Sequence, residues 1–104
     1  MSDEAKKDAP KEVGLQIHLD EKIAEGVYTN LALINHTDMD FTIDFLYVQP
    51  QAPKAIVRSR VITSPVHMKR FMLALQENVR RYEQRHGEIG TAAPAEVTPK
   101  GTYN

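Results

Sequence analysis

The sequence contains no cysteine, so histidines and carboxylates are the candidate side chains for metal binding or acid–base catalysis. The four histidines are His18, His36, His67 and His86, and no two of them stand at the spacing of metal ligands on one helix face. The run 36–40 (HTDMD) offers two carboxylates to a hard cation, but no further ligand stands close to it. A turn is the better interpretation, and we expect no metal and no cofactor.

Asp44 lies in the middle of a predicted strand, and the alternation of side chains places it on the same predicted sheet face as Arg58 and Arg60. A cross-strand ion pair is the simplest role for such a carboxylate. General acid–base catalysis would need a second titratable group in a pocket beside it, and the sequence offers none. No histidine is placed to activate Ser59 or its neighbouring hydroxyls. We therefore predict that the protein is not an enzyme.

A set of basic and aromatic residues is the remaining candidate for a binding site. Arg58 and Arg60 share a predicted strand face with Tyr28, and Lys54 stands at the rim of that face. Sheets often bind single-stranded nucleic acid in this way, with cations on the phosphates and an aromatic ring stacked on the bases. The same four residues are also candidates for contact with a protein partner.

Charge is unevenly divided along the chain, although the net charge is only -1. Residues 14–45 hold one basic residue against six acidic ones, whereas residues 46–86 hold eight basic residues against two acidic ones. This asymmetry is typical of a basic patch for an anionic partner, or of acidic and basic strands that neutralise each other across a sheet. No apolar run is long enough to cross a bilayer and no secretion signal is present, so we expect a cytoplasmic protein without membrane contact.

The elements that would position these residues are four strands followed by one helix. Period-two alternation and turn residues predict antiparallel strands over 15–19, 27–35, 41–49 and 55–63. A helix over 65–86 is predicted by Ser64 as its N-cap, Pro65 at its first position and Gly87 at its C-terminal end. The fold class is therefore α+β, with one domain at 14–87 between disordered tails at 1–13 and 88–104.

Both faces of the predicted sheet are too apolar for one helix to cover. The helix has one apolar stripe, and strand parity gives it a sheet face to pack on. The opposite face still holds large aliphatic residues, and no other segment of the chain can cover them. We therefore predict a homodimer, unless a bulge within the consecutive apolar residues 46–48 changes the strand faces. The predicted dimer face comprises Ile34, Leu46, Val48, Ile56 and Ile62.

Residues 14–89 resemble a bacterial family known as domain of unknown function 3467. The similarity rests on residues 24–30 (AEGVYTN), 34–36 (INH), 44–45 (DF), 53–55 (PKA) and 59–65 (SRVITSP). That family has no established activity, so the resemblance implies no catalytic residues. The last strand and helix are also similar to those of the PUR repeat, a four-stranded sheet followed by one helix that dimerises and binds single-stranded nucleic acid.

Two functions follow from these observations, and they compete for the same surface. The first is a non-catalytic dimeric binding module that serves as a protein–protein adaptor or assembly subunit. The alternative is a single-stranded nucleic-acid-binding protein of PUR-like architecture. If the dimer buries the predicted aliphatic face, Arg58 and Arg60 must lie at its rim or pair with Asp44, because a buried unpaired charge is costly.

Overall fold

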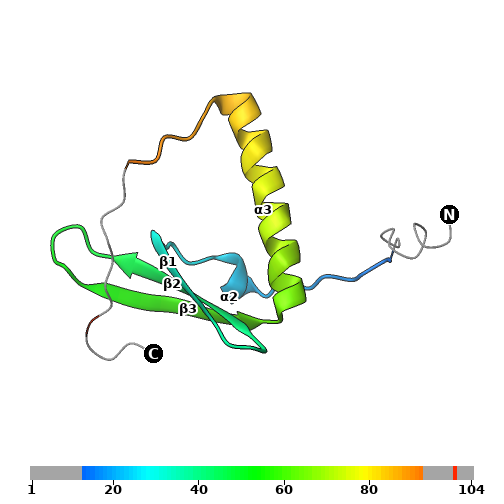
Figure 1. Cartoon of the computed structure of the whole chain (residues 1–104), viewed down its shortest axis with the longest axis horizontal. Helices are drawn as coiled ribbons and strands as arrows, with labels where there is room; N and C mark the ends of the chain where they lie inside the picture. The colour runs from blue at the N-terminus through cyan, green and yellow to red at the C-terminus, as the bar shows by residue number, and fades with distance from the viewer. Residues whose placement is uncertain (1–12, 93–99, 101–104) are drawn as a thin grey trace.

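The computed structural model describes residues 13–92 and residue 100. The elements follow in the order α2 (Glu21–Ala24), β1 (Leu31–His36), β2 (Phe41–Val48), β3 (Ala55–Thr63) and α3 (Pro65–His86). Figure 1 shows the three strands as one sheet, with α3 rising from the end of β3. The predicted α+β class is confirmed. The two predicted tails fall largely outside the described residues.

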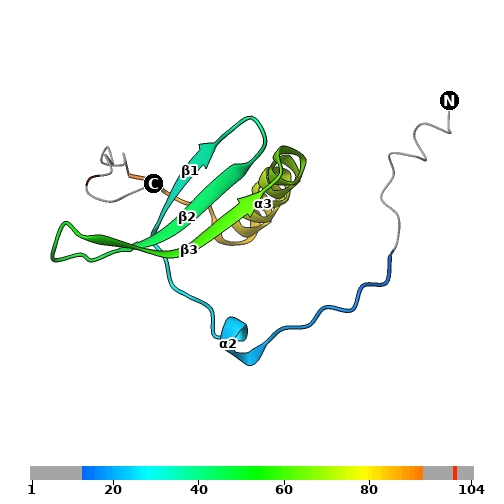
Figure 2. The ribbon, with the colours of Figure 1, turned by 90° about the horizontal axis from the view of Figure 1, so that it is seen from below.

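The sheet is antiparallel, with β2 in the centre and β1 and β3 at its two edges. It confirms three of the predicted strands, although the one predicted over 27–35 begins only at Leu31, and the count of four is not confirmed. Residues 13–20, which we call the arm, include the predicted first strand but belong to no strand or helix. The arm leads away from the sheet as a drawn-out segment (Figure 2). Its apolar residues are exposed, with Ile17 at 87% and Leu15 at 74%.

Local polar contacts explain how the chain turns between strands. The Thr37 hydroxyl accepts hydrogen bonds from the backbone N–H groups of Met39 and Asp40, each at 3.1 Å, which closes the β1–β2 hairpin. The turn predicted for the 36–40 run is therefore present. Between β2 and β3, the Gln49 N–H donates to the Lys54 carbonyl at 3.0 Å, so that the proline-containing loop is closed at its base.

A β-bulge after Phe45 changes which residues share a face. Phe45 pairs with Ser59, whereas the next residue, Leu46, pairs with Val57, so Arg58 is the extra residue on β3. Because side chains alternate along a strand, the register defines two faces. The Ile43 face carries Ala32, Ile34, Phe41, Ile43, Phe45, Tyr47, Ile56 and Val61. The Asp44 face carries Leu31, Leu33, Thr42, Asp44, Leu46, Val48, Val57, Arg60 and Ile62.

This register corrects the predicted grouping of aliphatic residues. The predicted dimer face is divided, since Ile34 and Ile56 lie on the Ile43 face while Leu46, Val48 and Ile62 lie on the Asp44 face. Odd and even positions along the sequence assigned these residues to the wrong faces for two reasons. They do not give the register between β1 and β2, and they do not locate the bulge in β3. Whether any of these five residues contacts a second copy remains a prediction.

The predicted helix forms with the predicted ends. The Ser64 hydroxyl caps α3 by accepting from the His67 N–H at 3.2 Å, and Pro65 takes the first position, where its missing donor costs nothing. Gly87 ends the helix at φ 94°, a backbone angle that favours glycine, and its N–H donates to the Glu83 carbonyl.

The helix does not cover the sheet. No residue of α3 is buried, and α3 projects away from the strands instead of lying across either face (Figure 1). The predicted packing of its apolar stripe on the sheet of the same chain is therefore wrong. That stripe, which we call the α3 stripe, consists of Met68, Phe71, Met72, Leu75, Val79 and Tyr82.

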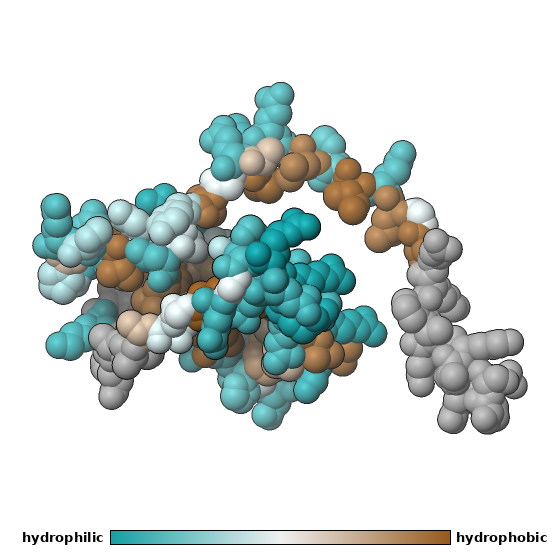
Figure 3. Space-filling model, turned by 90° about the horizontal axis from the view of Figure 1, so that it is seen from above, coloured by the Kyte–Doolittle hydropathy of each residue, from teal (hydrophilic) through white to brown (hydrophobic). Residues whose placement is uncertain are grey.

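Burial is confined to the central strand. Ile43 and Leu46 are the buried apolar residues among those described, and the carboxylate residue Asp44 between them is completely buried. The radius of gyration of 18.0 Å exceeds the roughly 13 Å of a compact domain of 100 residues. Apolar side chains are conspicuous on the surface, including a row along the arm (Figure 3).

Candidate functional site

Two tyrosines and one arginine form a cluster on the Ile43 face. The rings of Tyr28 and Tyr47 meet edge to face, with centroids 6.2 Å apart and planes at 70°. The Arg58 guanidinium carbon lies 5.2 Å from the centroid of the Tyr47 ring, a cation–π distance. We call Tyr28, Tyr47 and Arg58 the aromatic–arginine cluster. It combines exposed aromatic surface with a positive charge.

The strands and one asparagine hold this cluster together. Tyr47 belongs to β2, and the β3 bulge adds Arg58 to the strand next to it. Tyr28 precedes β1, where Asn30 fastens the chain to the end of β2. The Asn30 amide donates to the Val48 carbonyl at 3.1 Å and accepts from the Val48 N–H at 2.8 Å. An open depression lined by Tyr47 and residues 49–52 adjoins the cluster.

Arg60 lies apart from this cluster, on the Asp44 face. Its guanidinium donates to both carboxylate oxygens of Asp44, at 2.7 and 2.9 Å. The Asp44 side chain is fully buried, whereas that of Arg60 is 43% exposed. A bidentate charged pair of this kind satisfies a carboxylate that would otherwise be costly to bury. Arg60 therefore has a structural role, and the predicted ion pair is present.

The structure therefore brings together two of the four predicted contact residues. Tyr28 and Arg58 share the cluster, Arg60 points to the other face, and Lys54 lies in the loop just before β3. Tyr47 is the member of the cluster that was not among the predicted contact residues. Tyr47 keeps the regular alternation of β2 and meets Arg58 because the bulge places Arg58 on the Ile43 face, and no signal in the sequence locates that bulge in β3.

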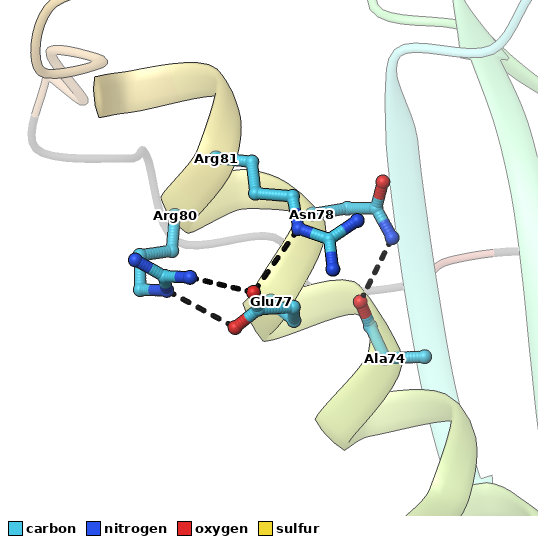
Figure 4. A network of polar contacts seen from close by, with 5 residues as sticks. All are labelled: Ala74, Glu77, Asn78, Arg80 and Arg81. Atoms are coloured by element: carbon cyan, nitrogen blue, oxygen red, sulfur yellow. Dashed lines mark hydrogen bonds and ion pairs between the residues drawn. The ribbon is translucent and has the colours of Figure 1, made fainter. Parts of the chain in front are cut away.

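The surface of α3 carries a second group of charges (Figure 4). Glu77 accepts two hydrogen bonds from Arg80, at 3.0 and 2.6 Å, and one from Arg81 at 3.1 Å. The hydrogen bond from Arg80 is the largest cause that lowers the pKa of Glu77 from 4.5 to about 2, while partial desolvation opposes it. The same contact raises the pKa of Arg80.

Residues 13–92 and residue 100 contain neither a metal-binding cluster nor a membrane-spanning helix. No group of three or more histidine, aspartate or glutamate side chains in this part of the chain could hold a metal ion. Neither of its helices is long and apolar enough to cross a membrane. The rings of His36 and Phe41 pack together with their centroids 5.3 Å apart, and those of His86 and Tyr82 with their centroids 4.7 Å apart.

One protein family accounts for nearly all of the sequence. The family model described as protein of unknown function (DUF3467) matches residues 1–91, which includes every described strand and helix. The chain belongs to the DUF3467 family. The matched region also contains all the residues of the aromatic–arginine cluster and the Asp44–Arg60 pair. No curated protein and no solved structure matches this DUF3467 chain, so the likeness to the PUR repeat is not shown.

The two β3 arginines of this DUF3467 protein should differ sharply in their effect on stability. Arg60→Ala removes the bidentate partner of a buried carboxylate and should lower the free energy of unfolding by about 3 kcal/mol. Arg58→Ala is the matched control, and loss of its exposed cation–π contact should cost less than about 1 kcal/mol. Urea denaturation of both variants at one protein concentration measures the difference. Equal losses would contradict a structural role specific to Arg60.

The pKa of Glu77 gives a second prediction for the DUF3467 chain. Because this pKa is lowered on folding, ionised Glu77 stabilises the helix above pH 4.5, and that contribution should be lost as the pH falls toward about 2. An NMR titration of the Glu77 carboxyl carbon should give a midpoint near 2. Arg80→Ala should raise this midpoint further than Arg81→Ala does, because Arg80 makes two of the three contacts. A midpoint near 4.5 in the unaltered protein would contradict the network.

Proposed function

We propose that this DUF3467 chain is a non-catalytic binding module that works as a homodimer, as a protein–protein adaptor or assembly subunit. The observation that carries the proposal is the exposed α3 stripe. Its residues Phe71 and Leu75 are 42% and 51% exposed in the single chain, and no residue of α3 is buried. A cytoplasmic location remains part of the same prediction.

Exposed apolar area on this scale favours association. A helix of 22 residues is about 33 Å long, so the α3 stripe is an extended apolar surface and not a few isolated apolar residues. Soluble monomers rarely expose contiguous apolar patches of more than a few hundred Å². Burial of such a patch is the main favourable term in protein association. The α3 stripe is therefore better suited to contact a partner than to remain exposed to water.

A second copy is the partner that fits this surface best. Every copy presents the same stripe, and a two-fold axis would bring identical stripes together in one self-complementary contact. The small core of the single chain supports the same choice, because domains with few buried residues are commonly stabilised by joining subunits.

The fourth strand of the sheet also belongs to this proposal. The arm alternates Leu15, Ile17 and Leu19 with polar residues, which is the pattern of a half-buried strand. It makes no strand pairing within its own described chain. We propose that the arm completes a four-stranded sheet in the functional assembly.

Single-stranded nucleic-acid binding is the second candidate, and the aromatic–arginine cluster favours it. Tyr28 is 72% exposed, so its ring is open to stacking, and Arg58 adds a positive charge beside it. Exposed aromatic rings together with cations are the elements that bind single strands without sequence preference. A PUR-like mode of binding stays a proposal that rests on this cluster.

Two leucines of equal exposure test the dimer. Leu75 and Leu73 are each 51% exposed in the single chain, but only Leu75 belongs to the α3 stripe. Leu75→Glu should weaken self-association about tenfold or more, because it places a charge in an apolar interface. Leu73→Glu should leave self-association unchanged. Sedimentation equilibrium at micromolar concentrations measures both. A monomeric unaltered protein, or equal effects of the two changes, would refute a dimer built on this stripe.

Fluorescence anisotropy with labelled single-stranded DNA tests the second candidate. If it is correct, Tyr47→Ala should weaken binding by about 1–3 kcal/mol through lost stacking. Arg58→Ala should reduce the slope of log K against log salt by about 0.7, the value expected for one phosphate contact. Arg85→Ala, at the far end of α3, is the control and should change neither quantity. Binding that is absent, or that does not depend on salt, would rule this candidate out and leave the protein-binding role.

A further inference from the structure

The arm has the sequence pattern of a strand, but it pairs with no strand of the described chain. Residues 15–20 (LQIHLD) keep a strict alternation of apolar and polar side chains, and their apolar members lie in solvent. A strand of six residues spans about 20 Å and needs hydrogen-bond partners along one side to bury its apolar face. The described chain supplies no such partners, because the arm leads away from its own sheet (Figure 2).

The sheet, in turn, has one edge suited to receive a strand. The outer edge of β1 is six residues long (LALINH), like residues 15–20 of the arm, and it contains no charged residue, proline or glycine. Its register with β2 is continuous. A regular, apolar and uncharged edge of this kind readily pairs with another strand.

The other edge is protected. β3 contains the bulge at Arg58, which interrupts the regular spacing of its backbone groups. Arg58 and Arg60 also place two charges along this strand. Both arginines are already engaged, one with Tyr47 and the other with Asp44, so they are poorly placed to attract the acidic end of the arm. Bulges and charged side chains are the usual means by which proteins block pairing at an edge.

The connection between the arm and β1 directs the arm outward. Asp20 caps the short helix α2 by accepting from the Lys22 N–H at 2.9 Å, which turns the chain where the arm ends. Gly26 then adopts φ 74°, a second change of direction before β1. In Figures 1 and 2 the arm consequently points away from the β1 edge of its own chain.

We infer that the arm of each copy pairs with the β1 edge of a second copy, so that two chains complete each other's four-stranded sheet. The inference rests on the proposed homodimer and specifies how it is held together. A stable interface needs about 800 Å² from each partner, and the α3 stripe of a single helix is narrow. The exchanged arms add Leu15, Ile17 and Leu19 from each copy to the buried surface.

The cysteine-free sequence allows a direct test by disulfide trapping in the full chain. His18 lies near the centre of the arm, and Leu33 and Ile34 lie at the centre of β1, one on each face of the sheet. The variants H18C/L33C and H18C/I34C therefore test the pairing for either facing of the arm. The matched control is H18C/S59C, which places the second cysteine at the centre of β3.

Oxidation of one of the β1 variants should give a covalent dimer, seen on a non-reducing gel and by mass spectrometry. About a tenfold excess over the β3 control is expected, because a disulfide forms only when the two Cα atoms approach within roughly 7 Å. A covalent monomer would show that the arm pairs with its own chain. A dimer trapped through Ser59→Cys would show that β3 is the edge. Either outcome overturns the inference.

Hydrogen exchange on the unaltered chain provides a readout that does not depend on the variants. The amide groups of residues 15–20 should be protected at high protein concentration and should lose that protection on dilution into the monomer range. If sedimentation shows a dimer while these amides stay unprotected and neither β1 variant is trapped, the inference fails and the proposed dimer stands. If sedimentation shows a monomer at micromolar concentration, the proposed dimer and the arm exchange both fail.

Discussion

The constraint on which this structure depends is the shortage of apolar burial within one chain. Ordering the backbone costs about 1–2 kcal/mol per residue in conformational entropy, and burial of apolar surface must offset that cost. Here the buried apolar residues of the described chain are Ile43 and Leu46, both on the central strand. They face opposite sides of the sheet, so neither side has a core of its own. The α3 stripe, the sheet edges and the arm are the surfaces left to provide the remaining burial.

A single extra residue in β3 separates two arginines into different roles. Without the bulge, Arg58 and Arg60 would both lie on the face of Asp44. With it, Arg60 keeps the buried carboxylate paired, while Arg58 stacks over Tyr47 on the other side. Arg60 therefore neutralises the only buried charge among the described residues, and the bulge leaves Arg58 as a second, exposed cation beside aromatic rings.

The sequence predicted the features that are encoded locally. Ser64, Pro65 and Gly87 specify the ends of α3 through backbone geometry that needs no distant contact, and the helix has the predicted bounds. The three strands follow from alternation and turn residues in the same way. The Asp44–Arg60 pair was also predicted, because the bulge leaves both residues on the same face of the sheet.

The sequence did not predict the features that depend on long-range register. Parity within one strand cannot show how β1 aligns with β2, so Ile34 was grouped with Leu46, which faces the other side. Tyr47 was missed for a different reason, because the bulge in β3 that brings Arg58 to the face of Tyr47 cannot be seen in the alternation of either strand. The docking of α3 was also mispredicted, because an apolar stripe shows only that a helix face needs a partner. It does not show whether that partner is the same chain or another one.

The register also removes a conflict between the two proposed functions. On parity alone, the dimer face and the nucleic-acid contacts occupied the same surface. In the structure, the aromatic–arginine cluster lies beside the end of β2 and the β3 bulge, whereas the proposed dimer uses the α3 stripe and the β1 edge. A two-fold dimer of this kind would present two copies of the cluster on one assembly. Two weak sites held at a fixed separation bind an extended ligand far more tightly than either does alone. Because the proposed dimer surfaces do not overlap the aromatic–arginine cluster, dimerisation would leave both clusters exposed and would strengthen binding of an extended ligand to them.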